Sequence, residues 1–267
     1  EMLEYCEADV RATKELVLAC RMMTEAEHRD WIICEQINDH GICIDREFAG
    51  AAVKYASEEA DAINARITRL TNGQITKFTQ SKRVRELVIE HMRDQGLNMD
   101  PVTRYKAGEV KLSMDKNARR ELMDLNAEGS MPLPDHIMEL IELTDDGNRS
   151  SVSKFAGMLS RADEDDRVRG AYVFAGAGQT QRFASRGLQV HNMRRDAYTQ
   201  TEADELLERM LRHEPLEDVM NTLSKGLRSA LIPRDDDHVF VVGDWSSIEA
   251  MGLPWLANSP GAEKKLD

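Results

Sequence analysis

Apolar residues recur at intervals of three and four over much of the first half of the chain, and this spacing constrains the fold more than any other feature. From Phe48 to Leu70 the series is continuous, and Asp45 stands where a helix N-cap is expected. A further series ends before Gly96, a residue type common at helix C-termini. The spacing therefore predicts helices joined by turns, with little strand, over residues 28–96.

The N-terminal segment also has helical spacing. Over residues 2–27 one stripe is predicted to be buried, and it consists of Cys6, Val10, Thr13, Val17 and Cys20. Further helices are predicted by the same criterion over residues 31–37, 113–127, 135–144, 151–160, 202–212 and 219–231.

The pattern changes near residue 150. Val168–Phe174 alternates as a strand does, and the apolar run Val239–Val242 is bounded by turns, as is typical of a buried central strand. A helix containing Pro254 is expected soon after that run. We therefore predict an α+β fold, with a mostly helical region over residues 28–150 and a β-sheet with flanking helices over residues 151–267.

Composition excludes several classes of protein. The chain has 267 residues, of which 41% are hydrophobic and 31% charged, as in globular rather than disordered proteins. No run of about 18 apolar residues is present, so no membrane span is expected. The four cysteines lack Cys-x-x-Cys spacing, which indicates reduced thiols in the cytoplasm. The chain begins at Glu1 without a signal peptide, and we interpret it as a piece of a longer protein.

Charge is distributed unevenly along the sequence. The net charge of −13 argues against general affinity for nucleic acid. Residues 180–195, however, contain no acid and four arginines, namely Arg182, Arg186, Arg194 and Arg195. This basic segment is a candidate for contact with nucleic acid. The alternative for any one of these arginines is a solvated surface charge.

Asp244 directly follows the apolar run that is predicted to be a buried strand. A carboxylate at the end of such a strand lies at the rim of a sheet, where its oxygens can bind a divalent metal. The alternative is a helix N-cap, since residues 246–249 fit a capping box.

The run Val241–Ala250 resembles motif A of family A DNA polymerases, the bacterial DNA polymerase I and phage replicative type. The resemblance implies that Asp244 binds two catalytic Mg²⁺ ions and that Glu249 excludes a ribose 2′-hydroxyl. It also implies a nucleotide pocket formed with Trp245, Ser246, Ser247 and Ile248. Met251 departs from the family, which usually has an arginine there, and this puts a structural ion pair in doubt.

The basic segment is similar to a second motif of the same family, Thr-Gly-Arg-x-Ser-Ser followed by Leu-Gln-Asn. The similarity implies that Arg182 is a catalytic residue at the primer–template minor groove and that Gln189 and Asn192 are polar neighbours of the duplex. Gln181 and Ala184 depart from the motif.

Residues 225–233 resemble the stretch that precedes motif A in the family, which implies contacts of Lys225 and Arg228 with the DNA backbone. Exposed helix charges without a partner are the alternative for both residues.

Tyr5 and Asp9 fit the Tyr-x-x-x-Asp motif of the 3′–5′ exonuclease that precedes the polymerase in this family. A polar pair facing solvent is the alternative for these residues. By the resemblance, residues 1–27 are the end of an exonuclease-like domain, residues 28–150 are a thumb-like region, and residues 151–267 are the first part of the palm.

The implied activity is template-directed DNA synthesis, in which a primer 3′-hydroxyl attacks a dNTP by two-metal catalysis. Primer–template DNA and dNTPs are the expected partners, and a monomer in the bacterial or phage-infected cytoplasm is expected. Each active site would hold at most half of its metal ligands, so the chain alone is predicted to be inactive. The alternatives are a non-catalytic DNA-binding fragment, a degenerate polymerase relic, or a metal-dependent hydrolase that uses Asp244 and Glu249.

Overall fold

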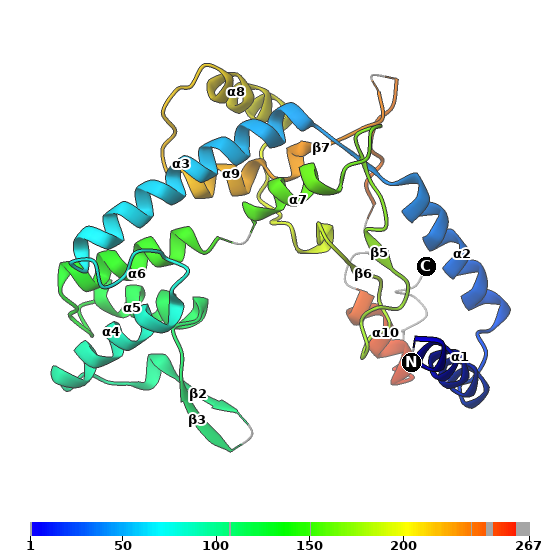
Figure 1. Ribbon diagram of the computed structural model, residues 1–267, viewed down its shortest axis with the longest axis horizontal. Helices are drawn as coiled ribbons and strands as arrows, with labels where there is room; N and C mark the ends of the chain where they lie inside the picture. The colour runs from blue at the N-terminus through cyan, green and yellow to red at the C-terminus, as the bar shows by residue number, and fades with distance from the viewer. Residues whose placement is uncertain (1, 107, 150, 236, 244–247, 260–267) are drawn as a thin grey trace. The chain divides into compact units, whose positions relative to one another are not determined.

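A computed structural model describes the chain except for residues 1, 107, 150, 236, 244–247 and 260–267 (Figure 1). Its contacts divide the chain into two units, residues 1–232 and residues 233–267. The described elements are mixed α and β with small sheets, as the sequence predicts. The helices are α1 (Met2–Ala19), α2 (Glu25–His40), α3 (Arg46–Leu70), α4 (Ser81–Asp94), α5 (Lys116–Ala127), α6 (Asp135–Gly147), α7 (Ser153–Arg161), α8 (Gln200–Leu211), α9 (Val219–Gly226) and α10 (Ile248–Leu256).

The strands are short and belong to three sheets. They are β1 (Ile42–Ile44), β2 (Thr103–Lys106), β3 (Glu109–Leu112), β4 (Arg167–Val168), β5 (Tyr172–Val173), β6 (Ala184–Ser185) and β7 (Leu231–Ile232). Single 3-10 turns occur at η1 (Asp100–Val102), η2 (Val190–Asn192) and η3 (Arg228–Ala230).

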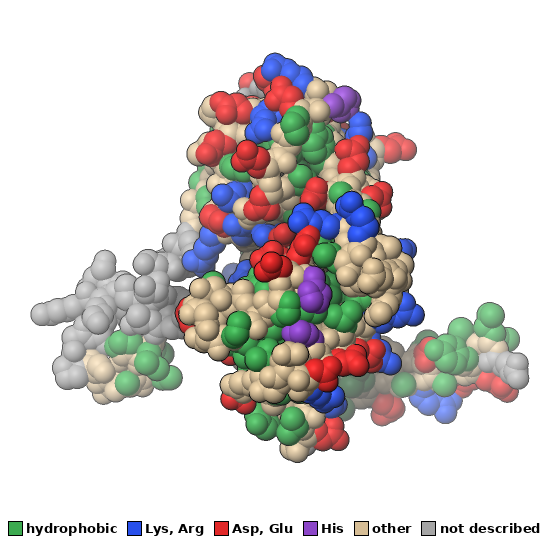
Figure 2. All heavy atoms as spheres, turned by 90° about the vertical axis from the view of Figure 1, so that its left-hand side faces the viewer, with side chains coloured by type: hydrophobic (Ala, Val, Ile, Leu, Met, Phe, Trp, Pro, Cys, Tyr) green, Lys and Arg blue, Asp and Glu red, His purple; other side chains and the backbone are tan. Residues whose placement is uncertain are grey.

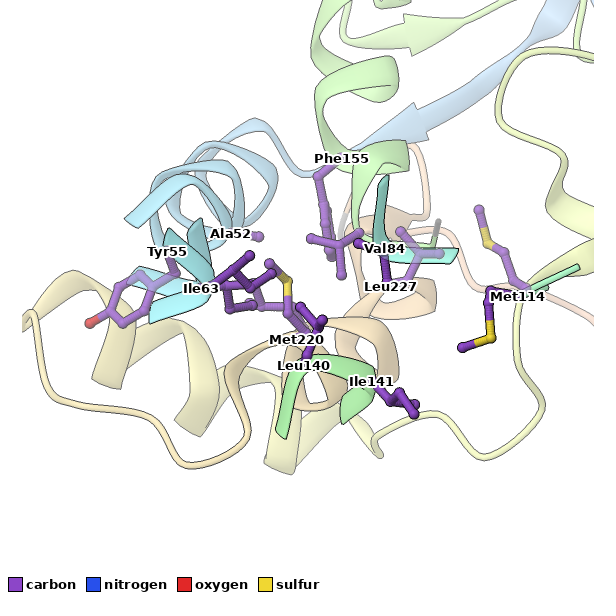
Figure 3. Close-up of a cluster of buried hydrophobic side chains, with 14 of the residues drawn as sticks. Ala52, Tyr55, Ile63, Val84, Met114, Leu140, Ile141, Phe155, Met220 and Leu227 are labelled. Atoms are coloured by element: carbon purple, nitrogen blue, oxygen red, sulfur yellow. The ribbon is translucent and has the colours of Figure 1, made fainter. Parts of the chain in front are cut away.

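Helix α3 organises the core of the larger unit. It begins as predicted, because the Asp45 Oδ1 accepts the N–H of Phe48 at 2.8 Å and satisfies a donor that the first turn leaves free. The helix packs against α6, α7, α8 and α9 (Figure 1). Ile63 of α3, Leu140 of α6 and Met220 of α9 lie together in the apolar cluster of Figure 3.

Strand β1 is central in the one three-stranded sheet among the described residues. It pairs antiparallel with β4 and β7, so that Ile42 faces Val168 and Cys43 faces Ile232. This strand of three residues lies within residues 28–96, where the sequence predicts little strand. The sheet joins residues before and after position 150 in one unit.

A β-hairpin between α4 and α5 is absent from the sequence predictions. Strands β2 and β3 pair in register from Thr103 opposite Leu112 to Lys106 opposite Glu109. Gly108 in the connecting turn has φ +81°, a conformation that glycine adopts without steric cost.

The predicted buried stripe of the N-terminal helix is wrong. No residue of α1 is buried, and Val10 and Val17 expose 69% and 54% of their surface. Apolar spacing indicates that a helix has an apolar face, but it does not supply a partner for that face. The helix also ends at Ala19 rather than at residue 27, and a capping box between Thr24 and Glu27 starts the next helix, α2.

Two further predictions after residue 160 hold only in part. The expected strand Val168–Phe174 is divided into β4 and β5, with Gly170 at φ +65° between them. The expected helix over residues 219–231 ends at Gly226 and continues as η3 and β7. Pairing of β7 with β1 draws the last residues out of the helix.

The smaller unit lacks the buried central strand predicted for Val239–Val242. These four residues form no strand, and their exposed fractions are 80%, 55%, 94% and 89% in order. An apolar run becomes a buried strand only when neighbouring strands pair with it, and no described strand does so here. The helix expected next is present as α10, with Pro254 inside it.

The described residues include no helix with the length and apolar character needed to cross a lipid bilayer. All four cysteines are free thiols; Cys34 and Cys43 are buried, while Cys6 and Cys20 are exposed. Over the face formed by the α4–α6 end of the larger unit, acidic and basic side chains are interspersed (Figure 2).

Candidate nucleic-acid interface

The basic segment begins on a small hairpin. Strands β5 and β6 pair Tyr172 with Ser185 and Val173 with Ala184. Gly176 lies so close to this pair that a Cβ atom added to it would be 2.7 Å from the Cβ of Ala184. The hairpin therefore needs a glycine at this position.

The chain after the hairpin is fixed by two buried side chains. Leu188 is 1% exposed and Met193 is 4% exposed, and η2 lies between them. Gln189 adopts the left-handed conformation, with φ +48° and ψ +52°. The buried anchors leave the intervening polar side chains at the surface, where a partner can contact them.

Three predicted DNA-contacting residues lie on this segment. Arg182, Gln189 and Asn192 are exposed. The carbonyl of Gln189 accepts a hydrogen bond from the Lys154 Nζ at 3.3 Å. His191 Nδ1 and Ser185 Oγ are 2.7 Å apart, which joins η2 to β6.

Helix α9 and η3 supply the other two predicted residues. The Arg228 Nη2 donates to the carbonyl of Met193 at 3.0 Å, which places Arg228 beside the segment that contains Asn192. The Lys225 Nζ lies 5.9 Å from the ring centre of Tyr198, a distance suited to cation–π attraction. The structure thus brings Asn192, Lys225 and Arg228 to the same part of the unit.

Arg194 belongs to the predicted basic segment, but its partners were missed. It donates through Nε to the Asp196 Oδ1 at 2.8 Å and through Nη1 to the Asn221 Oδ1 at 2.7 Å. The hydrogen bonds from Arg194 hold the pKa of Asp196 below its ordinary value, and the positive charge of Lys225 adds to this effect. Asp196 is the first acidic residue after the acid-free stretch 180–195. This position beside Arg194 and Arg195 was the sequence signal that could have identified it as an arginine partner.

Four of the six motif A residues with a predicted role lie outside the described residues. They are Asp244, Trp245, Ser246 and Ser247. Ile248 and Glu249 begin helix α10, in accord with a helix after the motif. Their proposed contacts with a nucleotide stay predictions.

The predicted exonuclease pair lies on α1, with Tyr5 68% exposed and Asp9 also exposed. A spacing of four places both side chains on one helix face, as expected. Within the part of the chain that the structure describes, no group of three or more His, Cys, Asp or Glu side chains is arranged to hold a metal ion.

The described arrangement is a surface of arginine, lysine and amide side chains on short, well-anchored backbone segments. Such side chains bind phosphate groups, as in proteins that recognise nucleic acids. No family model matches the chain, and no solved structure matches it.

A protein named DNA polymerase, from Bacillus phage SP02, is similar to this chain. The two are 26% identical over 271 residues, which cover 98% of the chain and 37% of the relative. The chain therefore spans little more than a third of the length of this relative. The similarity supports a relationship with DNA polymerases.

Proposed function

We propose that this chain is part of a DNA-directed DNA polymerase of the family A type, and that it contributes one half of the polymerase site. The observation that carries the proposal is the similarity, along 98% of the chain, to a phage protein named DNA polymerase. The resemblance of residues 241–250 to motif A supports the family A type in particular, because it rests on a short run of specific residue types.

In this proposal Asp244 is the metal ligand, since carboxylate oxygens are the ligands that Mg²⁺ prefers. Two bound Mg²⁺ ions would activate the primer 3′-hydroxyl and neutralise the charge on the leaving pyrophosphate. Glu249 restricts the space beside the sugar of the incoming nucleotide. Trp245, Ser246, Ser247 and Ile248 form the remainder of the nucleotide pocket.

The described residues have a separate task, which is to hold the primer–template duplex. Arg182 donates to base acceptors in the minor groove; these acceptors occur at every base pair and so report geometry rather than sequence. Gln189 and Asn192 are polar neighbours of the duplex. Lys225 and Arg228 contact backbone phosphates, which position the duplex without reading its sequence.

The polymerase is proposed to act as a monomer in the cytoplasm of a bacterial or phage-infected cell, with Tyr5 and Asp9 as the remnant of a proofreading exonuclease. A non-catalytic DNA-binding fragment or a degenerate polymerase relic is the second candidate. The departures from the family at Gln181, Ala184 and Met251 favour that candidate.

The deciding experiment uses the whole gene product that contains this chain. Asp244→Ala is expected to abolish primer extension while the affinity for duplex DNA stays within about two-fold, because one carboxylate contributes little to backbone binding. Asp237→Ala, a nearby exposed carboxylate, is the matched control and should extend primers normally. Full extension by Asp244→Ala, or no extension by the unmodified protein, would contradict the proposal.

Two further measurements separate the roles. Glu249→Ala should extend primers but incorporate ribonucleotides more readily, and unchanged ribose exclusion would remove Glu249 from the nucleotide pocket. The 267-residue chain alone should bind duplex DNA without extending it.

A further inference from the structure

The guanidinium of Arg194 is held in one orientation by two partners that bond to different nitrogens. Asn221, on α9, accepts from Nη1 at 2.7 Å. Asp196 accepts from both Nε and Nη2, so that the guanidinium and the carboxylate form a bidentate pair with two hydrogen bonds. A guanidinium fork matches a carboxylate and a phosphate with the same bidentate geometry.

The two members of this ion pair differ in exposure. The Arg194 side chain is 29% exposed, whereas that of Asp196 is 63% exposed. The guanidinium is therefore partly enclosed and fixed, while the carboxylate approaches it from the solvent side. Because the carboxylate is well exposed, water and counter-ions can solvate it when it leaves, which limits the cost of separating the pair.

Positive charge gathers around the Asp196 carboxylate. Lys225 acts on it electrostatically together with Arg194, and the neighbouring residue Arg195 is exposed. Asn221 Oδ1 also accepts from Arg149 at 3.3 Å, and Arg149 is in turn neutralised by Asp146. Asp218 acts on Arg194 electrostatically as well, but no hydrogen bond joins the two among the described contacts.

We propose that Arg194 is the core of a phosphate-binding site, and that Asp196 occupies this site until a phosphate group displaces it. Asn221 is the positioning residue, because it keeps the guanidinium fork aimed at the place that Asp196 now fills. Lys225 adds a second positive charge that acts on the same place. Only the source of the phosphate group rests on the proposed function, and that source is either the DNA backbone or a nucleotide triphosphate.

Asp196 acts as an internal competitor in this site. It neutralises Arg194 in the free protein and lowers the affinity for every phosphate ligand. A ligand must therefore gain further contacts nearby to displace it, which favours a polyanion over an isolated anion.

The first experiment compares Asp196→Asn with Asp204→Asn in the full chain, using fluorescence anisotropy with a labelled primer–template duplex. Both variants remove one negative charge, but Asp204 bonds only to Gln200 on α8 and has no arginine partner among the described contacts. Asp196→Asn should bind the duplex about five-fold more tightly than Asp204→Asn at about 50 mM salt, because a like charge beside the phosphate is removed. The slope of log affinity against log salt concentration should also be steeper for Asp196→Asn, by the amount expected for about one further phosphate contact.

A parallel titration with dNTP identifies the source of the phosphate. A selective gain in duplex affinity assigns the site to the DNA backbone, and a selective gain in dNTP affinity assigns it to the triphosphate. Equal affinities of the two variants for both ligands would overturn the proposal.

The second experiment does not depend on DNA binding. In Asp196→Asn the Nε–H resonance of Arg194, assigned with Arg194→Lys, should shift on titration with inorganic phosphate at constant ionic strength, and in the unmodified chain it should shift only at several-fold higher concentration. If no form of the chain binds duplex but this shift occurs, the proposed function fails and the phosphate site stands. If the duplex binds but the shift is missing in Asp196→Asn, the phosphate site fails and the proposed function stands.

Discussion

Helix α3 buries side chains along most of its length, whereas helix α1 buries none. Both are long helices in the same unit, and both have apolar residues at helical spacing. Around α3 the neighbours α6, α7, α8 and α9 complete the burial (Figure 1). The difference teaches that burial in this chain is concentrated where helices meet, while the side-chain contacts described for α1 are local ones such as the Glu7–Arg11 ion pair within the helix.

The largest expected effect is the loss of a core aromatic side chain. Phe155 is fully buried and its ring centre lies 6.0 Å from that of Phe48 on α3. Phe155→Ala should lower the free energy of unfolding by about 3–5 kcal/mol, because it removes buried surface and leaves a cavity. Urea denaturation followed by circular dichroism measures this loss.

The matched substitution on α1 is Leu16→Ala, at a side chain 64% exposed. It should change the free energy of unfolding by no more than about 0.5 kcal/mol. A loss as large as that of Phe155→Ala would mean that α1 is packed in solution, and the contrast between the two helices would disappear.

A smaller effect is expected at the end of α6, where the core approaches the backbone closely. A Cβ atom added at Gly147 would lie 2.5 Å from the ring of Phe78. Gly147→Ala should therefore destabilise the protein by about 1–3 kcal/mol, since the ring must move. Gly157 on α7 has no atom within 4 Å of its added Cβ, so Gly157→Ala should stabilise by up to about 1 kcal/mol. Equal melting temperatures for the two variants would contradict this account.

The smallest expected effect concerns the start of α2. The hydrogen bond from Arg21 and the N–H of Thr24 lower the pKa of Glu27 to about 2, from an ordinary value of 4.5. A lowered pKa means that the carboxylate stabilises the helix start above pH 4.5 and that this contribution is lost as the pH falls toward 2. Hydrogen exchange at the amide of Glu27 should therefore become less protected in acid.

Glu27→Gln is the control for this pH dependence. It should have weaker protection at neutral pH and little further loss in acid, because no proton is taken up at that position. An unchanged acid dependence in this variant would assign the effect to another carboxylate.

Local sequence signals predicted the helices well, because caps and spacing act within a few residues. Asp45 marks the start of α3, and Gly96, at φ +64°, follows the end of α4. The strands were predicted poorly, since β4 and β7 have two residues each and pair with the distant strand β1. Strand β6 is equally short and pairs with β5 across a hairpin. The hairpin of β2 and β3 is mostly polar, so the spacing of its few apolar residues did not indicate strands. Gly108 between them was a usable signal for a turn.

The candidate site, like the fold, could be predicted from the sequence only in part. The contacts of Arg182, Gln189 and Asn192 with DNA were predicted from the resemblance to a family motif; all three side chains are exposed, and their contacts stay predictions. Asn221 was missed because it lies on α9, and its relation to Arg194 arises only when that helix packs beside the basic segment. Asp244 and the three residues after it lie outside the described residues, and their roles stay predictions.

The pairing of β1 with both β4 and β7 has a consequence for synthesis on the ribosome. Ile42–Ile44 emerges early, but its second neighbour, Leu231–Ile232, is made only at the end of the larger unit. At translation rates of about 5–20 residues per second, the nascent chain spends roughly ten seconds or more with an unpaired strand edge. During that interval the edge is open to pairing with other chains, so chaperone binding or a translational pause near residue 232 would affect the yield of folded protein.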